Sequence, residues 1–155
     1  MKQTGKTRAI CGAATGAAGL VVALAMTTAG GSLARFLPDA PWFHLVACVG
    51  AATAGVALAD GFGRRGQLGA LAAVLVAPIV TAVGAVIATM LLVLVFEPTG
   101  GWGAVSDAAP LGLLAVTDGI GTSPVVAVTW GLSLAGVHMV MRRVRGLAPH
   151  PLKTG

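Results

Sequence analysis

Side chains that could carry chemistry are scarce in the apolar parts of this sequence. His138 follows small residues at Ala127, Gly131 and Ala135, and at 100° per residue these four positions fall within an arc of about 80° on a helix. Because small residues beside a histidine leave room for a flat macrocycle, His138 is a candidate haem or chlorophyll ligand. The simpler interpretation is a hydrogen bond between His138 and a neighbouring helix, and we expect no bound cofactor.

Histidine and cysteine also occur one helical turn apart, at His44 and Cys48. Side chains four residues apart lie on one face of a helix, so these two could ligate the same metal ion. Protein zinc sites use three or four protein ligands, and the sequence offers no clear third ligand. Cys11 and Cys48 are expected near opposite ends of two helices, too far apart for a disulfide. We therefore predict no metal site and two free thiols.

Catalytic motifs are absent from the sequence. It contains no phosphate-binding loop, no Gly-x-Ser-x-Gly elbow, no His-Glu-x-x-His and no Cys-x-x-Cys. Ser123 could act as a nucleophile, but only Asp118 stands near it in the sequence. The long apolar segments contain no Asp, Glu, Lys or Arg, whereas proton relays in membranes are built from such residues. We predict that the chain is not an enzyme.

The composition accounts for this scarcity. Of 155 residues, 56% are hydrophobic and only 10% are charged, and the mean hydropathy is +0.90. An ordinary soluble domain has about 25% charged residues. Intrinsic disorder requires low hydrophobicity and high charge. The composition therefore excludes a soluble enzyme, a soluble binding module and a disordered chain.

Four charge-free intervals are long enough to cross the roughly 30 Å hydrocarbon layer of a membrane as helices. We predict an all-α fold, a polytopic integral membrane protein with one membrane domain over 1–155 and four transmembrane helices at about 9–33, 41–59, 67–96 and 123–142. Residues 97–122 are predicted to form an outer loop. That loop carries a short interfacial or re-entrant segment, with Pro110 in its first turn. The first interval could also be a secretory signal, but it is longer than the roughly 7–15 apolar residues of a signal core.

The basic residues are distributed unevenly over the predicted connections. With four spans, nine of the ten lie on the side of both termini, and Arg35 alone lies opposite. The positive-inside rule places that side in the cytoplasm. We thus predict a bacterial inner-membrane protein with both termini cytoplasmic and no nucleic-acid partner. Its predicted cytoplasmic charge cluster consists of Asp60, Arg64, Arg65, Arg142, Arg143 and Arg145.

One cytoplasmic loop carries a familiar pattern. Residues 58–68 read Leu-Ala-Asp-Gly-Phe-Gly-Arg-Arg-Gly-Gln-Leu. This segment resembles the loop between the second and third helices of the major facilitator superfamily, whose pattern is Leu-Ala-Asp-Arg-x-Gly-Arg-Arg-x-x-Leu. The resemblance implies a charge clasp between Asp60 and the pair Arg64 and Arg65. It covers 11 of 155 residues, Gly61 replaces the first arginine, and the family has twelve helices. We interpret it as convergence.

Small side chains at every fourth residue indicate where membrane helices approach one another. The longest such ladder lies in the third predicted helix and consists of Gly69, Ala73, Ala77, Thr81, Ala85 and Thr89. Gly55 in the second helix and Gly131 in the fourth mark further predicted contacts. Pro78 predicts a kink in the third helix, and Trp130, well inside the fourth, is expected to pack in the ordinary way.

Dense small-residue ladders without a polar interior favour a protein built to pack. The leading prediction is a small non-catalytic accessory or assembly subunit of a larger membrane complex, in contact with membrane lipids and with other subunits or further copies of itself. A second hypothesis is a channel or transporter subunit whose path forms on oligomerisation and is lined by Thr81, Thr89, Thr129 and Ser133. A third is a pigment- or haem-associated protein that uses His138.

Overall fold

The structure is a computed structural model that describes residues 2–33, 41–96 and 101–146. Every regular element in these residues is helical, which confirms the all-α fold class. In chain order the elements are α1 (Lys2–Ala29), α2 (Pro41–Ala57), the short 3₁₀ helix η2 (Ala59–Gly61), α3 (Gly66–Phe96), α4 (Gly101–Thr122) and α5 (Pro124–Gly146).

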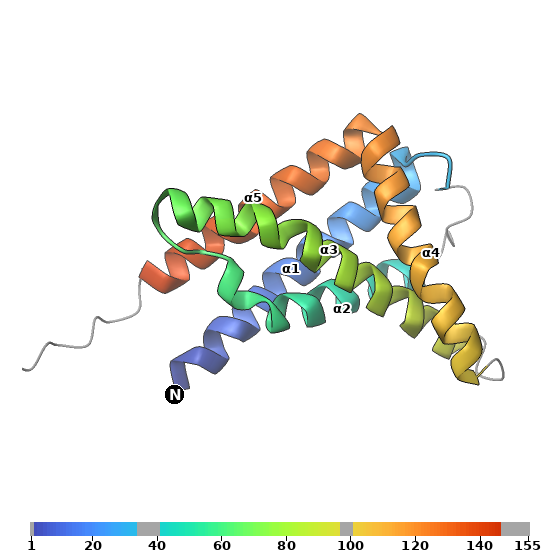
Figure 1. The fold of residues 1–155 in the computed structure, drawn as a ribbon, viewed down its shortest axis with the longest axis horizontal. Helices are drawn as coiled ribbons and strands as arrows, with labels where there is room; N and C mark the ends of the chain where they lie inside the picture. Colours follow the sequence, from blue (N-terminus) through green and yellow to red (C-terminus); the bar gives the residue numbers. More distant parts are fainter. Residues whose placement is uncertain (1, 34–40, 97–100, 147–155) are drawn as a thin grey trace, which may run out of the picture.

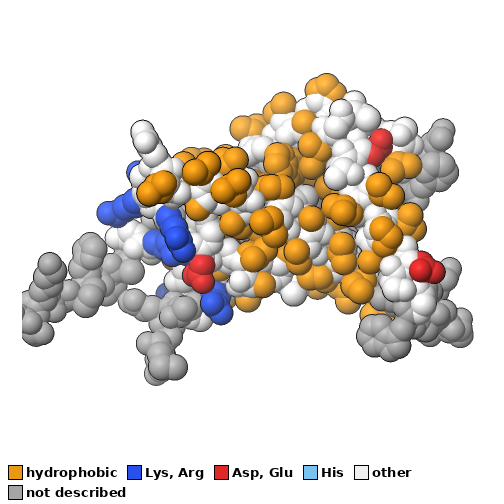
Figure 2. Space-filling model, viewed as in Figure 1, with side chains coloured by type: hydrophobic (Ala, Val, Ile, Leu, Met, Phe, Trp, Pro, Cys, Tyr) orange, Lys and Arg blue, Asp and Glu red, His pale blue; other side chains and the backbone are white. Residues whose placement is uncertain are grey.

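Three segments are long and apolar enough to cross a membrane: Gly5–Ala29 in α1, Gly66–Val95 in α3 and Pro124–Gly146 in α5. The apolar helix α2 has 17 residues, which gives it a length of about 26 Å. Apolar side chains are spread over the face seen in Figure 2, and the large apolar side chains exposed on the molecule include Leu68 and Leu132, which are 82% and 68% exposed. Exposed apolar surface of this extent marks a membrane or partner contact, and together with the three long apolar helices it indicates a helical membrane protein.

The five long helices form a closed ring of neighbours. Helix α1 packs against α2 and α5, α2 packs against α3, α3 against α4, and α4 against α5. Helices α3 and α5 make few contacts with each other across this ring. In Figure 1, α1, α2, α3 and α5 run between the left and right ends of the molecule, whereas α4 lies steeply across the right-hand end. The ring arrangement leaves space in its interior.

Residues 97–122 are predicted from the sequence as an outer loop with a short helical segment, and in the described part of that range the helix is longer than predicted; α4 is not among the segments that are long and apolar enough to cross a membrane. Residues 101–122 form the continuous helix α4, with Pro110 inside it rather than in its first turn. A close contact explains the difference, because a Cβ at Gly112 would overlap the Thr89 hydroxyl and lie 2.6 Å from the Ala85 carbonyl oxygen. Packing of α4 on α3 therefore stabilises a helix that its glycines and proline disfavour on their own.

The other boundaries lie nearer to the predicted ones. Helix α1 begins at Lys2, seven positions before the predicted start, and ends at Ala29, just before two consecutive glycines. Helix α3 continues through Pro78 without interruption, and Pro78 is exposed. Helix α5 begins at Pro124, where a proline costs no helical hydrogen bond.

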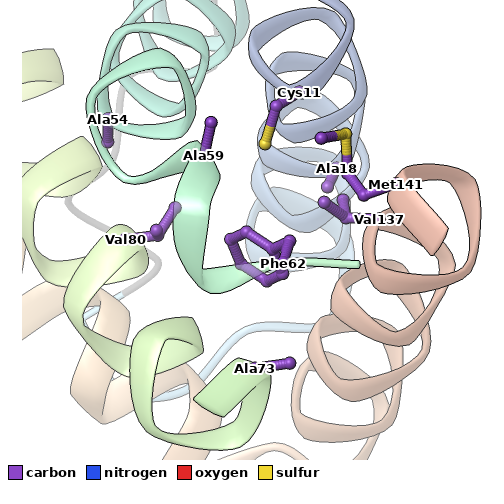
Figure 3. Packing of buried hydrophobic residues seen from close by; sticks show 9 residues of the cluster. All are labelled: Cys11, Ala18, Ala54, Ala59, Phe62, Ala73, Val80, Val137 and Met141. Atoms are coloured by element: carbon purple, nitrogen blue, oxygen red, sulfur yellow. The ribbon is translucent and has the colours of Figure 1, made fainter. Parts of the chain in front are cut away.

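The core near the N-terminal end of α1 is built around an aromatic residue from a loop. Phe62, which follows η2, is fully buried, and its cluster comprises Cys11, Ala18, Ala54, Ala59, Ala73, Val80, Val137 and Met141 (Figure 3). The chain reverses immediately afterwards at Gly63, whose φ is +76°. A second cluster joins α1 to α5 through Val22, Ala25, Met26 and Val126. The first cluster includes residues of α1, α2, α3 and α5.

Candidate functional site

Charged side chains from three segments meet at one end of the bundle. The Asp60 carboxylate lies 3.5 Å from Arg8 Nη2 of α1 and 3.7 Å from Arg145 Nη2 of α5. Arg145 Nη2 also donates a hydrogen bond of 3.0 Å to the Ala59 carbonyl oxygen. The Asp60 side chain is 67% exposed, and exposed pairs of this kind contribute about 0–1 kcal/mol each. Their main effect is to bring the ends of α1 and α5 to the same turn.

The charge clasp implied by the loop resemblance is arranged differently in the structure. Arg64 Nε donates to the backbone carbonyl oxygen of Asp60 at 2.9 Å, not to its carboxylate. The Arg65 guanidinium lies next to Gly146, where a Cβ would be 2.9 Å from its Nη2. That position is the carboxyl end of α5, where the helix dipole favours a positive charge. The carboxylate instead pairs with Arg8, which the predicted cluster omits, and Arg142 and Arg143 are exposed.

His138 lies near the same end, half-buried on α5. Its Nδ1 accepts a hydrogen bond of 3.3 Å from the Gly63 N–H, so the proton of the neutral ring is on Nε2. The partner is therefore the loop after η2 and not a neighbouring helix. His138 is not among the residues that line the apolar cavity of the bundle.

The remaining candidate ligands are dispersed. His44 Nε2 lies 3.2 Å from Thr27 Oγ1, which ties α2 to α1, and both cysteines are free, with Cys11 buried and Cys48 half-buried. Within residues 2–33, 41–96 and 101–146, no three His, Cys, Asp or Glu side chains are placed to hold a metal ion.

Asp118 and Ser123, the other pair with possible chemistry, join the far end of α1 to the corner between α4 and α5. The Asp118 carboxylate accepts hydrogen bonds from Ser32 Oγ at 3.0 Å and from the Leu33 N–H at 2.8 Å. Ser123 Oγ donates to the Ala29 carbonyl oxygen and accepts from the Val126 N–H, as an N-cap of α5 does. Both side chains therefore have structural partners.

An apolar, partly open cavity of about 550 Å³ lies within the ring and is lined by residues of all five long helices. The polar side chains on its wall are Thr15, Thr81, Thr89 and Trp130. Trp130 Nε1 donates a 2.8 Å hydrogen bond to Thr81 Oγ1, which connects α5 to α3 across the ring. No charged side chain of the described residues lines this space. Among the described residues, this cavity is thus a place where an apolar ligand could be held.

The hypothetical channel lining is divided by the structure. Thr81 and Thr89 face the cavity, whereas Thr129 and Ser133 are not part of its wall. Val80 belongs both to the cavity wall and to the buried cluster around Phe62. The cavity therefore adjoins that cluster.

Gly131 lies on a different face of α5 from the one predicted. It is exposed, and a Cβ built at Gly131 would have nothing within 4 Å. The side chains that α5 directs inward are larger: Val126, Val137 and Met141 are buried, and Trp130 reaches Thr81. These large side chains fill a wide interior better than small ones, so the face with Ala127, Gly131 and Ala135 is turned away from the ring.

The other predicted packing residues lie inside the bundle. Gly55 is buried against Thr15 of α1, and Gly69 is buried against the backbone of Arg64. Ala73 and Ala77 of α3 are 8% and 7% exposed. The ladder of small residues on α3 thus faces inward along its length.

Comparison with protein-family models, with curated proteins and with solved structures found no match.

Proposed function

We propose that this chain is a non-catalytic subunit that supports or assembles a larger membrane complex. The observation that carries the proposal is the outward face of α5, where Gly131 and Ala135 are both exposed. Small residues spaced four apart let membrane helices approach closely and associate. This face has no partner within the described part of the chain, so a helix of another protein can occupy it.

The small residues of α1 and α2 show how such a face is used when a partner is present. A Cβ at Gly12 would lie 3.1 Å from the Ala52 carbonyl oxygen, and one at Gly16 would lie 3.1 Å from the Ala52 Cβ. Both glycines are buried in the contact between the two helices. The equivalent pattern on α5 makes no such contact with residues 2–33, 41–96 and 101–146, which favours an external partner for it.

For the location, we propose the bacterial inner membrane with both termini cytoplasmic. Arg8, Asp60 and Arg145 meet at one end of the bundle, in agreement with an arrangement in which α1, the loop after α2 and α5 share one side. An excess of Lys and Arg marks the cytoplasmic side of membrane proteins.

The test is purification of the full chain in a mild detergent, followed by mass spectrometry of the proteins that accompany it. The double variant Gly131→Leu, Ala135→Leu fills the proposed contact and should reduce the amount of co-purifying partner at least tenfold. The matched control is Val74→Leu, Val83→Leu, at exposed positions of α3 that carry no small residues, and should behave as wild type. A wild-type chain that purifies alone, or only as a stable self-oligomer, would overturn the proposal.

A channel or transporter subunit is the second candidate, favoured by the cavity with Thr81 and Thr89 on its wall. The predicted path forms on oligomerisation, so this function requires several copies of the chain to assemble. Solute or ion flux into liposomes that contain the purified chain, measured for wild type and for Thr89→Val, tests it. Flux absent from both would exclude this candidate.

A further inference from the structure

We propose that the cavity inside the helix ring binds one acyl chain of a bilayer phospholipid. The inference goes beyond the proposed subunit role and does not depend on it, because the cavity lies inside the ring and the proposed partner face lies outside.

The chemistry of the wall selects a hydrocarbon. Thr15, Thr81 and Thr89 donate their hydroxyl protons to carbonyl oxygens of their own helices, at 2.8, 2.9 and 2.8 Å. The indole N–H of Trp130 is donated to Thr81. Every polar side chain on the wall has therefore used its donor, and a buried polar ligand would pay for unmet hydrogen bonds. A saturated or unsaturated hydrocarbon forms no hydrogen bonds with water, so its burial carries no such cost.

The dimensions fit one extended chain. The volume of about 550 Å³ lies within the range of about 300–1,000 Å³ for small-molecule sites. The wall follows α3 from Val80 to Val93, which is about 20 Å at 1.5 Å per residue. One leaflet occupies about 15 Å, half of the hydrocarbon layer. The cavity is thus long and narrow, with a length similar to that of a phospholipid acyl chain.

An apolar space of this size is not stable when empty. The free-energy cost of an unfilled cavity rises with its volume, and water enters only where several polar groups can bond it. Neither Leu111 nor Leu114 closes the space, because both line the cavity and are 61% and 54% exposed. The opening beside them is therefore apolar and continuous with the lipid-facing surface, where phospholipid acyl chains are the solvent. These chains are the ligand that the site meets first and at the highest concentration.

The first arm of the test measures retained lipid. The full chain is purified in mild detergent and examined by native mass spectrometry, and its lipids are then extracted and identified. We expect one phospholipid per wild-type chain. Ala115→Phe, which projects a ring from the half-buried cavity wall of α4, should lower the retained fraction at least tenfold. Ala70→Phe, at an exposed position of α3, is the control and should retain as much as wild type.

The second arm uses the wild-type cavity and does not rely on Ala115→Phe folding. The chain has three tryptophans, and replacing Trp42 and Trp102 by Phe leaves Trp130 as the only one. Delipidated protein in detergent is titrated with a phospholipid that is brominated on its acyl chains. Quenching of the Trp130 fluorescence should saturate near one equivalent, and an unbrominated phospholipid should compete with it.

The two arms distinguish the possible results. Retained phospholipid and saturable quenching would support the proposal. Retention of an isoprenoid or another hydrophobic compound in place of phospholipid would overturn it. So would the absence of retained lipid together with quenching that does not saturate. Full retention of phospholipid by a folded Ala115→Phe variant would also overturn it.

Discussion

Two glycines on either side of the arginine pair in the loop before α3 differ in a way that can be measured. Gly63 and Gly66 have φ angles of +76° and +80°, a conformation that costs an L-residue about 1–2 kcal/mol. Their surroundings are not alike. A Cβ at Gly63 would lie 2.5 Å from the carbonyl carbon of Met141 and 2.7 Å from its Cβ, whereas a Cβ at Gly66 would have nothing within 4 Å.

We therefore expect Gly63→Ala to lower the free energy of unfolding by about 3 kcal/mol, the sum of the backbone cost and of overpacking against α5. Gly66→Ala should lower it by only about 1 kcal/mol, because the backbone cost acts alone. Thermal unfolding followed by circular dichroism in detergent measures both variants. Equal losses at the two positions would show that Gly63 is not held against Met141.

The residue contacts at this end were only partly predictable. The sequence indicates that Asp60 and several arginines share one side of the membrane. It does not indicate that the carboxylate pairs with Arg8, 52 residues away, or that His138 accepts from Gly63, 75 residues away. Such pairs depend on how α1, α3 and α5 are placed relative to one another. A count of charged residues gives no information about that placement.

At the scale of the helices, the contact between α1 and α2 depends on an absent side chain. A Cβ at Gly55 would overlap Thr15 Oγ1 and lie 2.7 Å from Thr15 Cβ. Thr15 cannot move aside easily, because it is only 1% exposed and its hydroxyl is bonded to the Cys11 carbonyl oxygen. We expect Gly55→Ala to destabilise the fold by about 1–3 kcal/mol through overpacking.

The matched variant is Gly136→Ala on α5, where a Cβ would have nothing within 4 Å. Alanine is the better helix former, so this change should leave stability unaltered or raise it by about 0.5–1 kcal/mol. The fraction of each variant that remains monodisperse in size-exclusion chromatography after heating provides the comparison. A loss for Gly136→Ala as large as that for Gly55→Ala would contradict the assigned helix faces.

The helices themselves differ in how well the sequence predicts them. A long apolar run must be helical in lipid, since only a helix satisfies its own backbone groups there, and α1, α2, α3 and α5 follow from that rule. Helix α4 does not, because Asp107, Pro110 and several glycines dilute its apolar pattern while contact with α3 stabilises it. The sequence also does not determine how α5 is rotated about its own axis. Its small face and its large face both qualify as packing faces, and only the width of the ring decides between them.

At the scale of the whole molecule, charge is separated along the bundle. Arg8, Arg145 and Asp60 lie together at one end, and Figure 2 shows Lys and Arg side chains gathered there. Asp118 binds the residues that follow the other end of α1. The membrane potential and the translocation machinery both respond to a difference in charge between the two ends of a bundle. This charge difference therefore predicts the orientation of the entire chain.

Thiol accessibility tests that orientation. In a background with Cys11→Ala and Cys48→Ala, one new cysteine is placed at Lys6, Gln67 or Ser106, which are exposed positions near the starts of α1, α3 and α4. A membrane-impermeant maleimide should label Ser106→Cys in intact cells and should label Lys6→Cys and Gln67→Cys only after permeabilisation. The reason is that the basic residues beside Lys6 and Gln67 resist translocation.

The pattern of labelling distinguishes two ways in which the predicted membrane topology could be wrong. If Lys6→Cys and Gln67→Cys are both labelled in intact cells and Ser106→Cys is not, the bundle is intact but inserted in the opposite direction. If Lys6→Cys and Gln67→Cys lie on opposite sides, α1 and α2 do not cross as a pair, and the ion pair of Arg8 with Asp60 cannot form. Since both residues belong to the same end of the ring, labelling of Lys6→Cys and Gln67→Cys on the same side is the result that the fold itself requires.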